Sequence, residues 1–215
     1  MKKLVLGLSL LLAAAGTVHA AGDVEAGKVK AAACGACHGA DGNSLAPNFP
    51  KLAGQGVRYL TKQINDIKSG ARPVPMMTAM VANLSEQDIA DISAYFASQS
   101  SSTGKAKDDT EMLALGARVY RGGNEATGTA ACDACHSPTG AGNAAAGFPR
   151  LGGQHAGYIE AQLKAFRAAG RDDDVADANK RRNDGAGDTA MMQPVAAKLS
   201  DSEIKAVANF IQGLH

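Results

Sequence analysis

The feature that most constrains the fold of this chain is an internal repeat. The motif Cys34-Gly-Ala-Cys37-His38 returns as Cys132-Asp-Ala-Cys135-His136, and the residues after each motif keep their order and nearly their spacing. Self-similarity on this scale indicates one structural unit that occurs twice. The recurring residues are Phe49-Pro50, Gly54-Gln55 and Tyr59 in the first copy, and Phe148-Pro149, Gly153-Gln154 and Tyr158 in the second. We therefore expect two tandem domains with the same fold.

Residues 1–20 have the pattern of a secretory signal. Lys2 and Lys3 supply the charged start, an apolar run follows over residues 4–15, and small residues end the segment at Ala20. Such a run is too short to span a bilayer, so cleavage after Ala20 is favoured over a retained N-terminal anchor. Export of this kind predicts a periplasmic protein.

The boundary between the two copies lies in residues 98–108. This stretch is rich in Ser, Gly and Lys and lacks apolar periodicity, which is typical of a linker. We expect the first domain over residues 21–100, the linker over residues 101–108 and the second domain over residues 109–215.

Charge and composition narrow the class of protein. The formal net charge is +1, and it becomes about −1 once the two signal lysines are removed, a balance that gives nucleic-acid binding no support. Trp is absent and aromatic residues make up only 4% of the chain. Two small domains with so few large side chains would each have a meagre core. A bulky group other than a side chain is therefore expected to help fill each domain.

Apolar residues in both copies recur with a helical period. Segments 57–67 and 89–96 of the first copy, and segment 204–211 of the second, place apolar residues at i, i+3 and i+4 spacing. Ser85-Glu-Gln-Asp88 and Ser200-Asp-Ser-Glu203 are capping boxes that would begin the last helix of each copy. We find no convincing strand pattern, so the prediction is an all-α protein.

The C-x-x-C-H motif is the attachment signature of c-type haem. Two thiols on one short helical turn can meet the two vinyl groups of the porphyrin, and the adjacent imidazole then points at the iron. The sequence therefore predicts two covalently bound haem c groups, one in each domain. The predicted attachment residues are Cys34, Cys37, Cys132 and Cys135, and the predicted iron-ligating histidines are His38 and His136.

Other uses of the paired cysteines fit less well. A structural zinc site would have to combine two pairs that are about a hundred residues apart, each followed directly by a histidine. A thioredoxin-like redox pair needs a βαβ context, which this chain lacks. A disulfide within either motif would close a tiny, strained loop and stabilise little.

The second axial ligand of each iron is expected to be a methionine. Methionine sulfur is the usual partner of histidine in cytochromes c, and it raises the reduction potential. A Met-Met pair recurs before the final capped helix of each copy, as Met76-Met77 and Met191-Met192. Met80 has no counterpart in the second copy. His155 and His215 have no counterparts in the first, and each is expected to be exposed or locally bonded. The residues alone leave open which methionine of each pair binds iron.

Taken together, these residues resemble the di-haem cytochrome c4 family over essentially all of the mature sequence. The most similar stretches are residues 34–39, 41–44, 46–55, 147–155, 195–200 and 211–215. The resemblance implies two class-I cytochrome c domains related by a pseudo-two-fold axis, with haem propionate edges facing across the interface. It also implies that Met77 and Met192 supply the axial sulfur. One departure from the family is a shorter segment before Met77.

The function that this resemblance implies is electron transfer without substrate chemistry, so we expect a carrier and not an enzyme. The implied partners are membrane respiratory complexes: a quinol-oxidising cytochrome complex as donor and a cbb-type haem-copper oxidase as acceptor. Small, weak interfaces are typical of such encounters, and loose association with the membrane is compatible with them.

Two alternatives to a carrier remain at this stage. A di-haem peroxidase would need one haem able to lose its sixth ligand, yet nothing in the sequence breaks the symmetry of the two Met pairs. A gas or redox sensor would lack an accompanying signalling domain. The copies differ mainly in an Asp- and Arg-rich insertion at residues 171–188, which is expected to be a solvated surface loop, with a partner-docking loop as the alternative.

Overall fold

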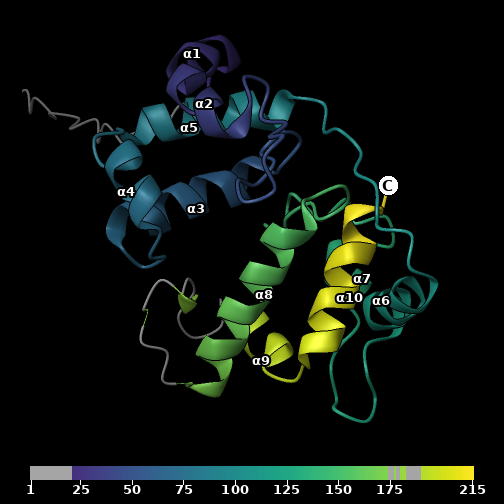
Figure 1. The fold of residues 1–215 in the computed structure, drawn as a ribbon. Coiled ribbons are helices and arrows are strands. Elements are labelled where there is room, and N and C mark those ends of the chain that lie inside the picture. Colours follow the sequence, from purple (N-terminus) through teal and green to yellow (C-terminus); the bar gives the residue numbers. More distant parts are fainter. Residues whose placement is uncertain (1–20, 174–176, 178–179, 183–189) are drawn as a thin grey trace, which may run out of the picture.

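A computed structural model of the chain describes residues 21–173, 177, 180–182 and 190–215. The predicted secretory signal lies outside the described residues, as does much of the insertion at residues 171–188. The described chain forms two helical lobes that follow one another in sequence and are joined by one extended segment (Figure 1). Within these residues no β-strand forms, apart from two isolated β-bridges in the second lobe. The prediction of an all-α protein is confirmed.

The two lobes repeat one order of helices. The first lobe contains α1 (Val24–Lys30), the 3₁₀ turn η1 (Ala31–Ala33), α2 (Gly35–His38), α3 (Val57–Ser69), α4 (Pro75–Val81) and α5 (Glu86–Ser98). The second contains α6 (Thr110–Gly122), α7 (Asp133–His136), α8 (Ala156–Arg171), α9 (Met192–Ala196) and α10 (Asp201–Gln212). None of the helices in the described part of the chain is long and apolar enough to cross a lipid bilayer.

The first and last helices of each lobe cross at a glycine. In the first lobe α1 packs on α5, and a Cβ atom at Gly27 would lie 2.0 Å from the carbonyl oxygen of Asp91. In the second lobe α6 packs on α10, and a Cβ atom at Gly116 would lie 2.3 Å from the carbonyl oxygen of Ala206. Glycine is required here because any side chain would hold the two backbones apart. The crossing fixes the start of each lobe against its last helix.

The predicted helices form where the apolar period placed them. Segment 57–67 lies in α3, segment 89–96 in α5 and segment 204–211 in α10. Both capping boxes are present: the Ser85 hydroxyl accepts from the Asp88 amide while the Asp88 carboxylate accepts from the Ser85 amide, and Ser200 and Glu203 do the same. Each box satisfies two amide groups that the first helical turn leaves without an internal partner.

Each lobe has its own apolar core. The first core contains Ala31, Leu60, Ile92, Tyr95 and Phe96. The second contains Val119, Tyr120, Ile159, Leu199, Ile204, Val207, Ala208, Ile211 and Leu214.

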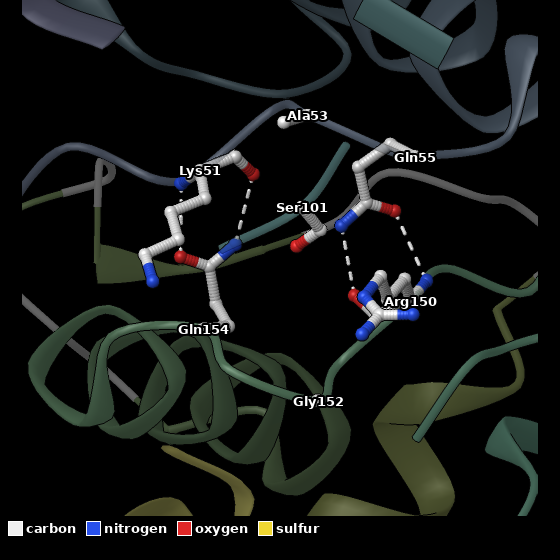
Figure 2. Close-up of a pocket in the computed structure, with 7 residues that line it drawn as sticks. All are labelled: Lys51, Ala53, Gln55, Ser101, Arg150, Gly152 and Gln154. Atoms are coloured by element: carbon white, nitrogen blue, oxygen red, sulfur yellow. Dashed lines mark hydrogen bonds between the residues drawn. The ribbon is translucent and has the colours of Figure 1, made fainter. Parts of the chain in front are cut away.

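Two glutamines join the lobes through matching hydrogen bonds, which Figure 2 shows. Gln154 of the second lobe accepts from the main-chain nitrogen of Lys51 at 2.9 Å and donates to its carbonyl oxygen at 3.0 Å. Gln55 of the first lobe does the same with Arg150, at 3.0 and 2.8 Å. Lys51 and Arg150 occupy equivalent repeat positions, as do the two glutamines. This reciprocity is what a pseudo-two-fold relation between the lobes produces.

The segment between α5 and α6 is fastened to both lobes. In the first lobe, the Asn43 side chain accepts from the Ser102 amide at 2.7 Å and donates to the Ser100 carbonyl at 3.0 Å. In the second lobe, the Asn209 side chain accepts from the Lys107 amide at 2.8 Å. A Ser- and Gly-rich composition is typical of a flexible chain, but these side-chain bonds give the connection a defined path.

The copies differ at a second place that sequence comparison missed. In the first lobe η1 and Cys34 follow α1 directly, whereas residues 123–131 separate α6 from Cys132. This loop is bonded to the rest of its lobe, since Asn124 donates to the Glu203 carboxylate at 2.7 Å and Lys198 donates to the Gly128 carbonyl at 2.8 Å. Glu203 lies 79 positions from Asn124, and Lys198 lies 70 positions from Gly128. No local sequence pattern predicts contacts over such separations.

Candidate haem sites

The two C-x-x-C-H motifs form the same short helical turn. In the first lobe Cys34 caps α2 and His38 ends it, and in the second Cys132 caps α7 and His136 ends it. The first cysteine of each motif is half-buried and the second is exposed. No disulfide joins any of the four cysteines, so each sulfur is available for haem attachment. The motifs lie in different lobes, so the two pairs do not combine into one zinc site.

Each motif histidine is buried and held by a proline carbonyl. The His38 Nδ1 atom lies 2.8 Å from the Pro50 oxygen, and the His136 Nδ1 atom lies 3.0 Å from the Pro149 oxygen. A carbonyl oxygen can only accept, so Nδ1 carries the proton and the lone pair is left on Nε2. This second contact fixes both the tautomer and the ring orientation of a metal-binding histidine.

Burial sets the protonation of the groups in both turns. Burial lowers the pKa of His38 and His136, although the bond to the proline carbonyl acts in the opposite direction. Both rings are therefore neutral near pH 7, which is the form that binds a metal. Burial also raises the pKa of Cys34, and it raises the pKa of Cys132 to about 11. These two thiols are thus protonated before any attachment.

The two methionines of each pair differ in exposure. Met76 and Met191 are 66% and 51% exposed, whereas Met77 and Met192 are only partly exposed. Met77 lies in the first turn of α4, which starts with Pro75, and Met192 is the first residue of α9. In each lobe the more sheltered methionine is the one that the family resemblance favours.

The remaining sequence candidates have other roles in the structure. Met80 is 52% exposed. The Nε2 atom of His155 lies 2.9 Å from the Ser44 carbonyl oxygen, so this ring joins the lobes. The Nδ1 atom of His215 lies 2.9 Å from the Gly213 carbonyl oxygen. The prediction that these histidines are exposed or locally bonded is correct for His215, and it is wrong for His155, which is half-buried and bonded across the domain interface.

The donor set fits a haem in each lobe. Two cysteine side chains on one helical turn are followed by a neutral imidazole whose Nε2 atom can bind a metal. A partly buried methionine follows at the start of a later helix. Sulfur and imidazole are the usual axial pair in electron-transfer cytochromes. Two helical lobes of one topology, each with this set, define a two-domain c-type cytochrome.

Comparison with known proteins gives the particular family. The family model described as "Cytochrome c" matches residues 24–100 and 120–215. The chain is 56% identical to cytochrome c4 of Pseudomonas aeruginosa over 215 residues, which covers all of both chains. The crystal structure of reduced recombinant cytochrome c4 from Pseudomonas stutzeri superposes with a TM-score of 0.81 at 52% identity, covering 91% of this chain and 100% of that one. The chain belongs to the cytochrome c4 family.

Family membership settles the cofactors and the kind of activity. The chain is a di-haem c-type cytochrome that carries electrons and is not an enzyme. The peroxidase alternative gains no support. A more distant relative, 36% identical over 84% of this chain, is the thiosulfate dehydrogenase electron acceptor of Stutzerimonas stutzeri.

Proposed function

We propose that the chain is a periplasmic shuttle between respiratory complexes, with one closed, six-coordinate haem in each domain. The first haem is held by Cys34 and Cys37, with His38 and Met77 as axial ligands. The second is held and ligated by the equivalent residues Cys132, Cys135, His136 and Met192. The observation that carries this assignment is the repeated turn in which a buried histidine donates a hydrogen bond from Nδ1 to a proline carbonyl.

The residues of the chain perform positioning and shielding. When bound, the haem iron supplies a one-electron ferrous-ferric couple. The Pro50 and Pro149 carbonyls hold each imidazole in one tautomer and one orientation, so Nε2 would be available to bind the haem iron. Paired strong ligands that stay in place keep reorganisation small. A site of this kind offers no open position for a substrate.

The axial assignment is tested by single substitutions. Met77→Ala and Met192→Ala should each remove about half of the weak near-infrared sulfur-to-iron band of the oxidised protein and lower one of the two potentials, because a thioether ligand raises the potential. Met76→Ala and Met191→Ala are matched controls on the neighbouring, exposed side chains, and both should leave the band intact. Loss of the band in the control variants would move the assignment by one residue.

The proposed partners are a quinol-oxidising cytochrome complex as donor and a cbb-type haem-copper oxidase as acceptor. The likeness to a thiosulfate dehydrogenase electron acceptor suggests that enzyme class as a second donor. Reduced protein should be oxidised by membranes that contain the oxidase and not by membranes from a strain that lacks it. Equal oxidation by both membranes would exclude this acceptor.

The proposed secretory signal is tested by the mass of the exported chain, which should start at Ala21.

A further inference from the structure

Two buried arginines from different lobes meet at the domain interface. Arg72 lies between α3 and α4 and is 9% exposed, and Arg182 lies between α8 and α9 and is 6% exposed. Arg72 donates to the side-chain oxygens of Gln63 at 2.6 Å and Gln162 at 3.0 Å. Arg182 donates to the same two oxygens at 2.7 Å each. Each glutamine oxygen therefore accepts from both guanidinium groups, one from each lobe. We call Arg72 and Arg182 the arginine pair.

Each member of the arginine pair also contacts the tyrosine of the opposite lobe. Arg72 donates to the Tyr158 hydroxyl at 3.0 Å, and Arg182 forms a side-chain hydrogen bond with Tyr59. Burial raises the pKa of Tyr59, with a further contribution from Tyr158, and the arginines oppose the shift. The Tyr59 phenol is therefore neutral near pH 7 and brings no negative charge to the pair.

The charge of Arg72 is not balanced by any residue that the structure describes. Its side-chain acceptors are the neutral groups of Gln63, Tyr158 and Gln162. A buried guanidinium with neutral partners alone is unfavourable, because the hydrogen bonds do not replace the solvation of its charge. A second guanidinium on the same acceptors adds repulsion. A carboxylate that enters from outside the protein chain would balance the charge of Arg72.

The haem groups bring carboxylates of this kind. Each haem has two propionates, on the porphyrin edge away from the vinyl groups that react with cysteine, and the planar guanidinium matches a carboxylate well. Arg72 precedes α4, which carries Met77. Gln193, the neighbour of Met192, donates to the Arg182 carbonyl at 3.3 Å. Both arginines are thus attached to the segments that carry the proposed axial methionines.

We propose that the arginine pair is one shared cationic site for propionates of both haems, so that each arginine affects the reduction potentials of both domains. This inference rests on the proposed haem sites. Arg182 comes from the insertion of the second domain, so that insertion supplies a buried residue of the interface. The expectation of a purely solvated surface loop at residues 171–188 is wrong for Arg182, because its guanidinium is buried against Gln63, Gln162 and the Phe166 ring.

An optical redox titration of the holoprotein tests the shared site. Arg72→Gln removes a positive charge that disfavours the more positive ferric state, so both potentials should fall. We expect the equilibrium constant for reduction of each haem to decrease by about threefold to tenfold, where tenfold corresponds to about 59 mV for one electron. Arg72→Lys, which keeps the charge, should restore most of the shift.

Arg58→Gln is the matched control. Arg58 also reaches across the interface, where it donates to the Ala145 carbonyl at 2.9 Å, but it is exposed. Its loss should leave both potentials within about twofold in the same equilibrium constant, because exposed charges are strongly screened. A shift confined to one haem, or equal shifts in the Arg58 and Arg72 variants, would overturn the proposal.

The haem content of each variant separates this proposal from the proposed function. Two covalent haems per chain and an intact near-infrared band show that attachment and ligation are unchanged, so a missing shift then counts against the arginine pair alone. A variant that loses haem or the band instead tests the proposed haem sites.

A second variant tests the proposal by the sign of a stability change. Gln63→Glu puts a carboxylate where both guanidinium groups donate. With propionates at the site, the added negative charge is repelled and the unfolding midpoint of the holoprotein should fall. A rise in the midpoint would show that no propionate occupies the site, and it would overturn the proposal even if Arg72→Gln does not fold.

Discussion

The side chain of Gln154 makes two hydrogen bonds to the main chain of Lys51, accepting at 2.9 Å and donating at 3.0 Å. An amide side chain that pairs in this way replaces the contacts that a neighbouring β-strand would make. Gln55 makes the same pair of hydrogen bonds with the main chain of Arg150, so the same kind of contact joins the lobes at two places. The apolar cores remain within their own lobes, and these glutamine hydrogen bonds join one lobe to the other.

Removal of either glutamine should weaken domain docking. Gln154→Ala or Gln55→Ala leaves an amide and a carbonyl of the opposite lobe without a partner, at a cost of about 1–3 kcal/mol for each buried group that stays unsatisfied. We expect faster proteolysis in the segment at residues 101–108, together with a lower denaturant midpoint. Gln99→Ala is the control, since that amide contacts Tyr95 and Ser98 of its own lobe. Similar cleavage rates in all three variants would contradict this role.

The glycines at the two helix crossings should not tolerate replacement by a residue with a side chain. Gly27→Ala and Gly116→Ala would place a Cβ atom 2.0 and 2.3 Å from a carbonyl oxygen of the facing helix. Overpacking of this kind typically costs about 1–3 kcal/mol, and clashes with backbone lie at the upper end. Denaturation followed by circular dichroism should show the loss. Gly122→Ala, in α6 with no atom within 4 Å of the added Cβ, should be neutral or stabilising. Unchanged stability at Gly27 would mean that the helices can separate freely.

The ion pair between α1 and α5 predicts an acid-dependent stability. The Lys30 ammonium, 2.7 Å away, lowers the pKa of Asp91 from 3.8 to about 2, assisted by the Asp23 amide and by Gln87. The folded-state pKa lies below the ordinary value, so this stabilisation is present above about pH 4 and is lost as the pH falls toward 2. Asp91→Asn should flatten the dependence of unfolding free energy on pH in this window. Glu86→Gln, an exposed change in the same helix, is the control, and an equal effect there would refute the assignment.

Haem attachment should fail one domain at a time. Cys37→Ala or Cys135→Ala removes one thioether and should impair attachment in its own lobe only, because each motif lies in a separate lobe with a separate core. The intact mass of the wild-type chain should include two haems that resist acid-acetone extraction. In each variant only one haem should remain fully resistant. Loss of both haems from one substitution would show that the domains depend on each other for attachment.

The elements that sequence predicted correctly are those fixed by neighbouring residues. The capping boxes at Ser85 and Ser200, and the apolar faces of α3, α5 and α10, depend on side chains within one or two turns. Because the second copy repeats the first, a prediction made for one lobe applies to the other as well. The Cys-His turns belong to the same class, since the spacing of the motif matches one short helix.

What the sequence by itself determined was therefore the helical class, the duplication and the chemistry of each haem motif. Only the tertiary structure decided that Gln154 binds Lys51, that His155 reaches Ser44 and that Arg182 is buried beside Arg72. These partners lie far apart in the chain or in different lobes, and their contacts depend on how two finished lobes dock. A buried polar group is satisfied by whatever the fold brings within about 3 Å of it, and no local pattern of residues specifies that partner.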